Sequence, residues 1–262
     1  MKSLLIGSSI ALVFMMPACK KPVSGGSSIA SGGAAVESGA ATTAHGAAGG
    51  KAEGAEAGKG KVADRGSREE LSKSLKSANA AFGKHDIEGT MKVLDEVPEE
   101  FRGDPGFLTL RGACYTEKRD FKAALEDFKE AAKKKPGDPS IRFNIAEMSF
   151  VTKDWDEAIK AFQVLQSQGA VKGTVGELVD FKLMLCEEGR GNDAEFERRA
   201  AENLKEADTL LAAYTKAAME YRDGKADEAK ATLADASAKF TDRGEVSPYY
   251  DTMVEFGYDP RK

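Results

Sequence analysis

The sequence predicts an all-α protein built from stacked helix-turn-helix units. Similar segments recur at a regular spacing of about 34 residues, turn-forming residues separate them, and no stretch shows the strict polar and apolar alternation of a half-buried strand. A helix start is indicated at Ser67, because Ser67 and Glu70 have the spacing of a capping box, in which two side chains bond free backbone N–H groups. The folded part is therefore expected to begin at residue 67.

The repeat is clearest at the start of the second helix of each unit. Segments that begin at Asp86, Asp120 and Asp154 share an apolar residue directly after the aspartate, then a small and a larger apolar residue at fixed offsets. A further copy begins at Lys225, slightly more than two repeat lengths after the third, which leaves room for one longer and more degenerate unit. The second helix of that unit is expected to include Phe196, Ala200 and Asn203.

Small and large residues alternate along the predicted second helices in a way that favours stacking. Ala124 and Ala158 would let two helix backbones approach closely, and Phe128 and Phe162, one turn later, would fill the space between neighbouring units. One hairpin cannot bury this face alone. Several units must therefore stack, with atypical units at the ends.

The second unit resembles the tetratricopeptide repeat family, whose unit is a helix-turn-helix of about 34 residues. The residues at the family's characteristic Gly, Tyr, Ala, Phe, Ala and Pro positions are Gly112, Tyr115, Ala124, Phe128, Ala131 and Pro136. In the third unit the matching residues are Ile145, Ala146, Ala158 and Phe162. The resemblance extends over about residues 67–240 and implies a right-handed superhelical solenoid of about five units that binds other proteins.

The end of the chain is expected to close this stack. Residues 67–243 are assigned to the repeat domain and residues 244–262 to a C-terminal capping segment. Ser247 and Pro248 are expected to start a last helix, in which Tyr249, Met253 and Phe256 share one side. We expect this helix to cap the last repeat.

The N-terminus carries the pattern of a secretion signal. Lys2 precedes an apolar run from Leu4 to Met16, and Met16-Pro17-Ala18-Cys19 follows directly. Residues 1–18 resemble a bacterial lipoprotein signal peptide, which implies that Cys19 receives a diacylglycerol and, after cleavage, a further acyl chain such as palmitate. Secretion with cleavage after Ala18 and no lipid is the alternative.

The segment that follows Cys19 is too poor in large apolar side chains to form a core. It consists mainly of Gly, Ala, Ser and Thr, so residues 19–66 are predicted to be the lipidated cysteine and a disordered tether. Lys20 directly after the cysteine suits sorting to the outer membrane. The resemblance thus implies a lipid-anchored protein of the cell envelope, at the outer membrane and facing the periplasm.

The composition excludes some classes of function. A net charge of −5 argues against nucleic-acid binding, which needs a concentrated basic face. The three cysteines have no spacing that would indicate a disulfide framework or a zinc site, so no metal or other cofactor is expected. Cys114 and Cys186 fall in predicted helices and are expected to be buried free thiols.

No group of residues indicates an enzyme. His85 is the one histidine in the region predicted to fold, and its place in a turn favours a solvated residue over a catalytic one. Trp155 is at the same repeat position as Ile87 and Phe121, which favours packing beneath a turn over partner binding.

A candidate binding surface follows from the resemblance. In tetratricopeptide arrays the first helices of successive units line a concave groove. The residues predicted to line it here are Asn79, Phe82, Phe143, Asn144, Glu147, Phe150, Tyr214 and Tyr221. Aromatic side chains of this kind often anchor partner peptides, but packing of the same side chains between repeats is the alternative.

The sequence therefore predicts a membrane-tethered scaffold that binds a partner protein or peptide in the groove. Outer-membrane protein assembly and pilus assembly are the processes that the resemblance implies, an analogy at the level of the fold. Two other hypotheses stay open. One is an envelope hydrolase or transferase with carboxylates in the groove, and the other is a purely structural spacer.

Overall fold

The computed structural model describes the backbone of residues 56–259 and the side chains of residues 67–259. The predicted signal peptide, Cys19 and most of the predicted tether lie outside this part of the chain. Residues 56–259 contain helices and no strand. None of these helices is both long enough and apolar enough to span a bilayer.

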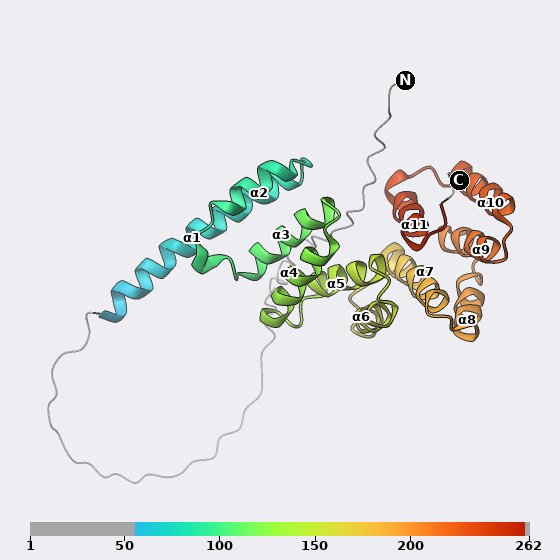
Figure 1. Cartoon of the computed structure of the whole chain (residues 1–262), viewed down its shortest axis with the longest axis horizontal. Coiled ribbons are helices and arrows are strands. Elements are labelled where there is room, and N and C mark those ends of the chain that lie inside the picture. The colour runs from blue at the N-terminus through green and yellow to red at the C-terminus, as the bar shows by residue number, and fades with distance from the viewer. Residues whose placement is uncertain (1–55, 260–262) are drawn as a thin grey trace, which may run out of the picture. The chain divides into compact units, whose positions relative to one another are not determined.

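The helices form five consecutive pairs and one final single helix (Figure 1). The pairs are α1 (Glu56–Phe82) and α2 (Ile87–Asp95), α3 (Pro105–Glu117) and α4 (Phe121–Lys134), α5 (Pro139–Val151) and α6 (Trp155–Ser167), α7 (Gly173–Gly189) and α8 (Asp193–Asn203), and α9 (Leu210–Arg222) and α10 (Ala226–Lys239). A short 3₁₀ helix spans Glu99–Phe101, and α11 spans Arg243–Phe256. From α2 to α10, each helix packs against the next one in the chain, so the prediction of an all-α solenoid of about five units is confirmed.

The first helix differs from the sequence prediction at its start. Helix α1 begins at Glu56, so Ser67 lies in its interior and residues 56–66, predicted to belong to the disordered tether, are helical. A capping box marks a place where a helix can begin, but it does not end a helix that comes from upstream. No proline precedes Ser67 in this stretch, and its Ala, Lys, Glu and Arg residues favour a helix, although Gly58, Gly60 and Gly66 oppose it.

The turn inside each unit has the same backbone geometry. The residue that precedes the N-terminal cap of the second helix has a positive φ in every unit. This angle is 58° at His85, 60° at Arg119 and 63° at Lys153, and it is 76° at Gly191 and Gly224. In the first three units the next residue is an aspartate, whose carboxylate accepts a hydrogen bond from the backbone N–H three residues later. His85 thus lies in an exposed turn, as predicted.

The buried side chains form two clusters along the stack. An N-terminal core is centred on Leu94, Leu110 and Phe128, and a C-terminal core on Phe162 and Phe181. Ala124 and Phe128, a small and a large residue of the repeat, are both fully buried. Phe196, Ala200 and Asn203 of α8 are also buried, which confirms the predicted second helix of the fourth unit.

The close approach of Phe128 to the backbone of α3 explains the glycine at position 112 of the repeat pattern. A Cβ atom at Gly112 of α3 would lie 2.8 Å from a ring carbon of Phe128 in α4. The aromatic ring therefore packs directly on the backbone of the preceding helix. This contact holds the two helices of the second unit together.

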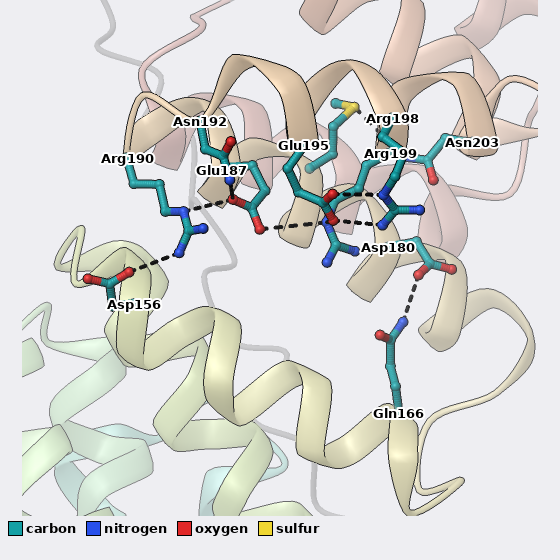
Figure 2. Close-up of polar contacts among 11 residues, drawn as sticks. Asp156, Gln166, Asp180, Glu187, Arg190, Asn192, Glu195, Arg198, Arg199 and Asn203 are labelled. Atoms are coloured by element: carbon teal, nitrogen blue, oxygen red, sulfur yellow. Dashed lines mark hydrogen bonds and ion pairs between the residues drawn. The ribbon is translucent and has the colours of Figure 1, made fainter.

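The first helix of the fourth unit, α7, is longer than those of the second, third and fifth units, and this unit is braced by a polar network (Figure 2). The side chain of Glu187 in α7 is only 3% exposed and lies 2.7 Å from the guanidinium of Arg190 and 3.8 Å from that of Arg199 in α8. Asn192 donates a further hydrogen bond to Glu187, and Arg190 reaches Asp156 of α6. These contacts join three helices and hold α7 in place.

Replacing Phe128 with alanine should lower the free energy of unfolding by about 3–5 kcal/mol, because the ring is fully buried between two helices and leaves a cavity. Urea unfolding followed by helical circular dichroism measures the change. Lys129→Ala on the exposed side of the same helix is the matched control. Equal stability of the two variants would contradict the packing of α3 on α4 through this residue.

Candidate functional site

The first helices of the last three units form a common face. We define the first-helix face as the surface of α5, α7 and α9 that carries Phe143, Phe181 and Tyr214. Each of these residues lies the same number of positions before the N-terminal cap of the second helix of its unit. The caps are Asp154, Asn192 and Lys225, respectively. Equivalent repeat positions therefore bring three aromatic rings to the same side of neighbouring helices.

Helix α11 lies on this face. It packs against α5, α7 and α9, and Figure 1 shows it beside α7 and α9. The helix is thus in contact with the first helices of three units, a wider contact than the predicted cap on the last repeat. Tyr249 and Met253 are buried, and Phe256 is partly buried, as expected for the shared side of this helix.

The start of α11 also differs from the prediction. The helix begins at Arg243 and not at Ser247, because Asp242 caps it by accepting a hydrogen bond from the Gly244 backbone N–H. Pro248 consequently lies inside the helix. A proline in this position cannot donate the usual intrahelical hydrogen bond.

Aromatic contacts join α11 to the first-helix face. The ring of Tyr249 lies 5.5 Å from that of Phe181 and 5.2 Å from that of Tyr214, measured between centroids. Tyr258, just after the helix, stacks on Tyr221 at 5.2 Å and donates a hydrogen bond to Glu188. Such pairs add to the free energy of apolar burial.

The same contact extends to the turn between α5 and α6. Phe256 lies 5.6 Å from Trp155, which in turn lies 5.5 Å from Phe150. Trp155 therefore packs near its own turn, as predicted, and also contacts the C-terminal helix. The sequence pattern did not indicate this second contact.

A charged cluster is buried between α11 and the first-helix face. Lys182 of α7 is 3% exposed, and its ammonium lies 3.1 Å from a carboxylate oxygen of Glu147 in α5 and 3.9 Å from one of Glu255 in α11. The ammonium also lies 4.5 Å above the centre of the Phe150 ring. When both carboxylates are ionised, the cluster carries one net negative charge in a place that excludes water.

Burial decides the protonation of this cluster. Burial, together with Glu147 and Asp251, raises the pKa of Glu255 to about 7, against the opposing effects of Lys182 and Arg119. Burial alone would lower the pKa of Lys182, but the two glutamates outweigh it, so that pKa is raised and the ammonium keeps its charge. The lysine is paired with Glu147, whereas Glu255 is easily protonated.

Four of the eight residues predicted to line a groove lie at the contact with the C-terminal segment, namely Glu147, Phe150, Tyr214 and Tyr221. Phe143, Asn144, Phe150 and Tyr214 are buried, and Glu147 and Tyr221 are partly buried. In this structure their side chains contact other parts of the chain: Phe143 packs edge to face on Phe162 of its own unit. The packing alternative therefore describes their present environment, and their role in binding a partner stays a prediction.

Two of the eight predicted residues lie elsewhere. Asn79 and Phe82 are partly buried near the end of α1, and Phe82 packs on the N-terminal core. The structure does not bring them together with the four residues at the α11 contact. They belong to a different part of the surface from the α5, α7 and α9 positions that α11 contacts.

Sequence reasoning missed the contribution of the fourth unit. Phe181, Lys182 and Glu188 belong to the contact with α11, but the degenerate first helix of this unit hid their repeat positions. A signal was present in the sequence. Phe181 lies as many positions before Asn192 as Phe143 lies before Asp154, so the two phenylalanines hold the same repeat position. The burial of Lys182 had no such signal, because a lone lysine in a helix is normally exposed.

The two cysteines of the described region have a structural role in the core. Cys114 and Cys186 are buried free thiols, as predicted, and burial raises the pKa of the Cys114 thiol to about 12. Among the described side chains, no three His, Cys, Asp or Glu residues are grouped so that they could hold a metal ion. Neither thiol is activated for nucleophilic chemistry.

Comparison with known proteins agrees with the repeat architecture. A family described as YpiA-like, tetratricopeptide repeats matches residues 121–170. The match begins at the first residue of α4 and includes both helices of the third unit. The search of curated proteins finds no similar sequence.

Glu255→Gln should change how stability depends on pH. The folded chain holds the Glu255 proton up to about pH 7, whereas an exposed glutamate releases it near 4.5, so folding loses stability as pH rises through this window. The variant removes this loss and should be more stable than the wild type at about pH 8 by at most about 3 kcal/mol, with little difference at about pH 5.

Urea unfolding at both pH values measures this difference. Glu245→Gln, at an exposed position of the same helix, is the matched control and should follow the wild type. A constant difference between Glu255→Gln and wild type at the two pH values would show that Glu255 is not protonated in the buried cluster.

Proposed function

We propose that the chain is a membrane-tethered protein interaction scaffold of the bacterial cell envelope, which binds a partner protein or peptide on the first helices of its repeats. The observation that carries this proposal is the contact of α11 with α5, α7 and α9. A surface that holds one helix through aromatic rings has the chemistry to hold another. The match to tetratricopeptide repeats supports the same class of function.

The proposed location depends on the N-terminal sequence. The apolar run that ends at Met16, followed by Cys19, supports lipidation, and Lys20 supports sorting to the outer membrane with the repeats in the periplasm. Residues 20–55, rich in Gly, Ala and Ser, would then separate the anchor from the repeats.

The buried cluster of Lys182, Glu147 and Glu255 gives the enzyme hypothesis its best residues, but its geometry favours the scaffold. The side chains of these residues are 3%, 14% and 8% exposed, so a substrate would have to replace α11 to reach them. Lys182 also neutralises one of the two carboxylates. A catalytic pair of carboxylates needs access to the substrate and a free acid and base.

Cys19→Ser should abolish lipid attachment and release the protein from the membrane fraction, because the cysteine sulfur is the atom that would carry the diacylglycerol. Metabolic labelling with radioactive palmitate and fractionation of cells measure both effects. Cys114→Ser is the matched control, since its thiol is buried and should play no part in lipidation. Continued palmitate labelling of Cys19→Ser would contradict a lipid anchor at this residue.

A photocrosslinking amino acid placed at Phe82 or Tyr221 should capture a reproducible partner in cells, because both positions are partly exposed on first helices. Mass spectrometry of the adducts identifies the protein. The control position is Lys129, exposed on the second helix α4. Absence of an adduct from both first-helix positions, or equal capture from Lys129, would favour the structural spacer over the scaffold.

A further inference from the structure

Helix α11 presents a regular set of anchors to the first-helix face. Tyr249, Met253 and Phe256 are spaced by four and then three residues, the spacing by which an amphipathic helix places one side in a groove. Glu255 adds a carboxylate that faces Lys182. The pattern is therefore an aromatic residue, an apolar residue four positions later, an acid two positions after that, and an aromatic residue next.

The polar match between α11 and this face is incomplete. Among the described residues, four buried oxygens at the contact have no hydrogen-bond partner. They are one carboxylate oxygen each of Glu147 and Glu188 and the hydroxyl oxygens of Tyr221 and Tyr249. Buried polar atoms without partners oppose burial, so the docked state of α11 is less stable than its apolar contacts alone would make it.

The sequence of α11 also disfavours a stable helix in its first half. Gly244 and Ser247 are weak helix formers, and Pro248 removes an intrahelical hydrogen bond. Residues 241–245 are exposed, so the connection from α10 does not hold the helix down. Docking of α11 therefore depends mainly on the residues from Tyr249 onward.

We infer that the face of α5, α7 and α9 is a groove for an amphipathic helix of the α11 pattern, and that α11 is an internal competitor which a helix of a partner protein displaces. The inference rests on the proposed function and adds the chemistry of the partner. The partner helix carries two aromatic anchors around an apolar residue, and an acidic side chain that reaches Lys182. Because α11 is tethered, it competes at a high effective concentration, and a partner must bind more tightly than α11 does.

The test uses the full chain and a fluorescent synthetic peptide of residues 243–259. The chain variant Tyr249→Ala/Met253→Ala weakens the internal helix without changing the groove, so it should bind the peptide at least tenfold more tightly than the wild-type chain does by fluorescence anisotropy. Arg243→Ala, at an exposed position of α11, is the matched control and should bind like the wild type. A peptide with Glu255→Lys should lose at least tenfold in affinity for the double variant, since it places a cation against Lys182.

Equal peptide binding by the wild type and the double variant would overturn the inference. Hydrogen exchange of the wild-type chain gives a second measurement that does not depend on a variant. Amides of α11 should exchange at least tenfold faster than those of α7, and exchange of both helices only in global unfolding would overturn the inference. A dimer of the double variant or wild type that forms by exchange of α11, detected by light scattering, would assign the groove to a second copy of this chain and overturn the assignment to another protein.

This test and the crosslinking test fail separately. Peptide binding uses the purified chain, so it reports on the groove whether or not a partner exists in the cell. Capture from Phe82 without peptide binding would leave the scaffold proposal intact and place the partner away from α11.

Discussion

The architecture depends on the burial of one side of each helix pair by the next pair. Ala124, Ala158, Phe128 and Phe162 are all fully buried, and the rings of Phe128 and Phe162 pack on Gly112 and Phe143 of their own units. No pair could bury these side chains alone. The stack is therefore the smallest arrangement that satisfies the repeat, and the positions of the first helices follow from it.

This arrangement places Phe143, Phe181 and Tyr214 on one side of three neighbouring helices. The chain uses that side for its own C-terminal helix, through aromatic contacts and a buried cluster of one lysine and two glutamates. Apolar contacts favour the docked helix, while the buried carboxylate of Glu255 and the hydroxyl groups without partners oppose it. The balance between these two contributions decides how readily the groove opens.

The stability of the docked α11 bears directly on the proposed function. A scaffold that exposed a long aromatic groove would attract non-specific partners, because large apolar patches promote association. In the proposed scaffold, the internal helix that covers the groove prevents such contacts, and a partner with a better match would replace it. Lys182 lies beside the position of Glu255 in the docked helix, so a helix with a cation at that position would be disfavoured.

The sequence by itself determined the helical class, the length of the repeat and the identity of the second helices, including Phe196, Ala200 and Asn203 in the degenerate unit. These features depend on spacing along the chain, which a sequence displays directly. The sequence also showed that Tyr249, Met253 and Phe256 share one side of the last helix. Only the tertiary structure decided what that side packs against, where α1 and α11 begin, and that Lys182 is buried. An apolar stripe indicates that one side of a helix is buried. Which surface buries it depends on contacts between residues far apart in the chain, and the local pattern does not specify these contacts.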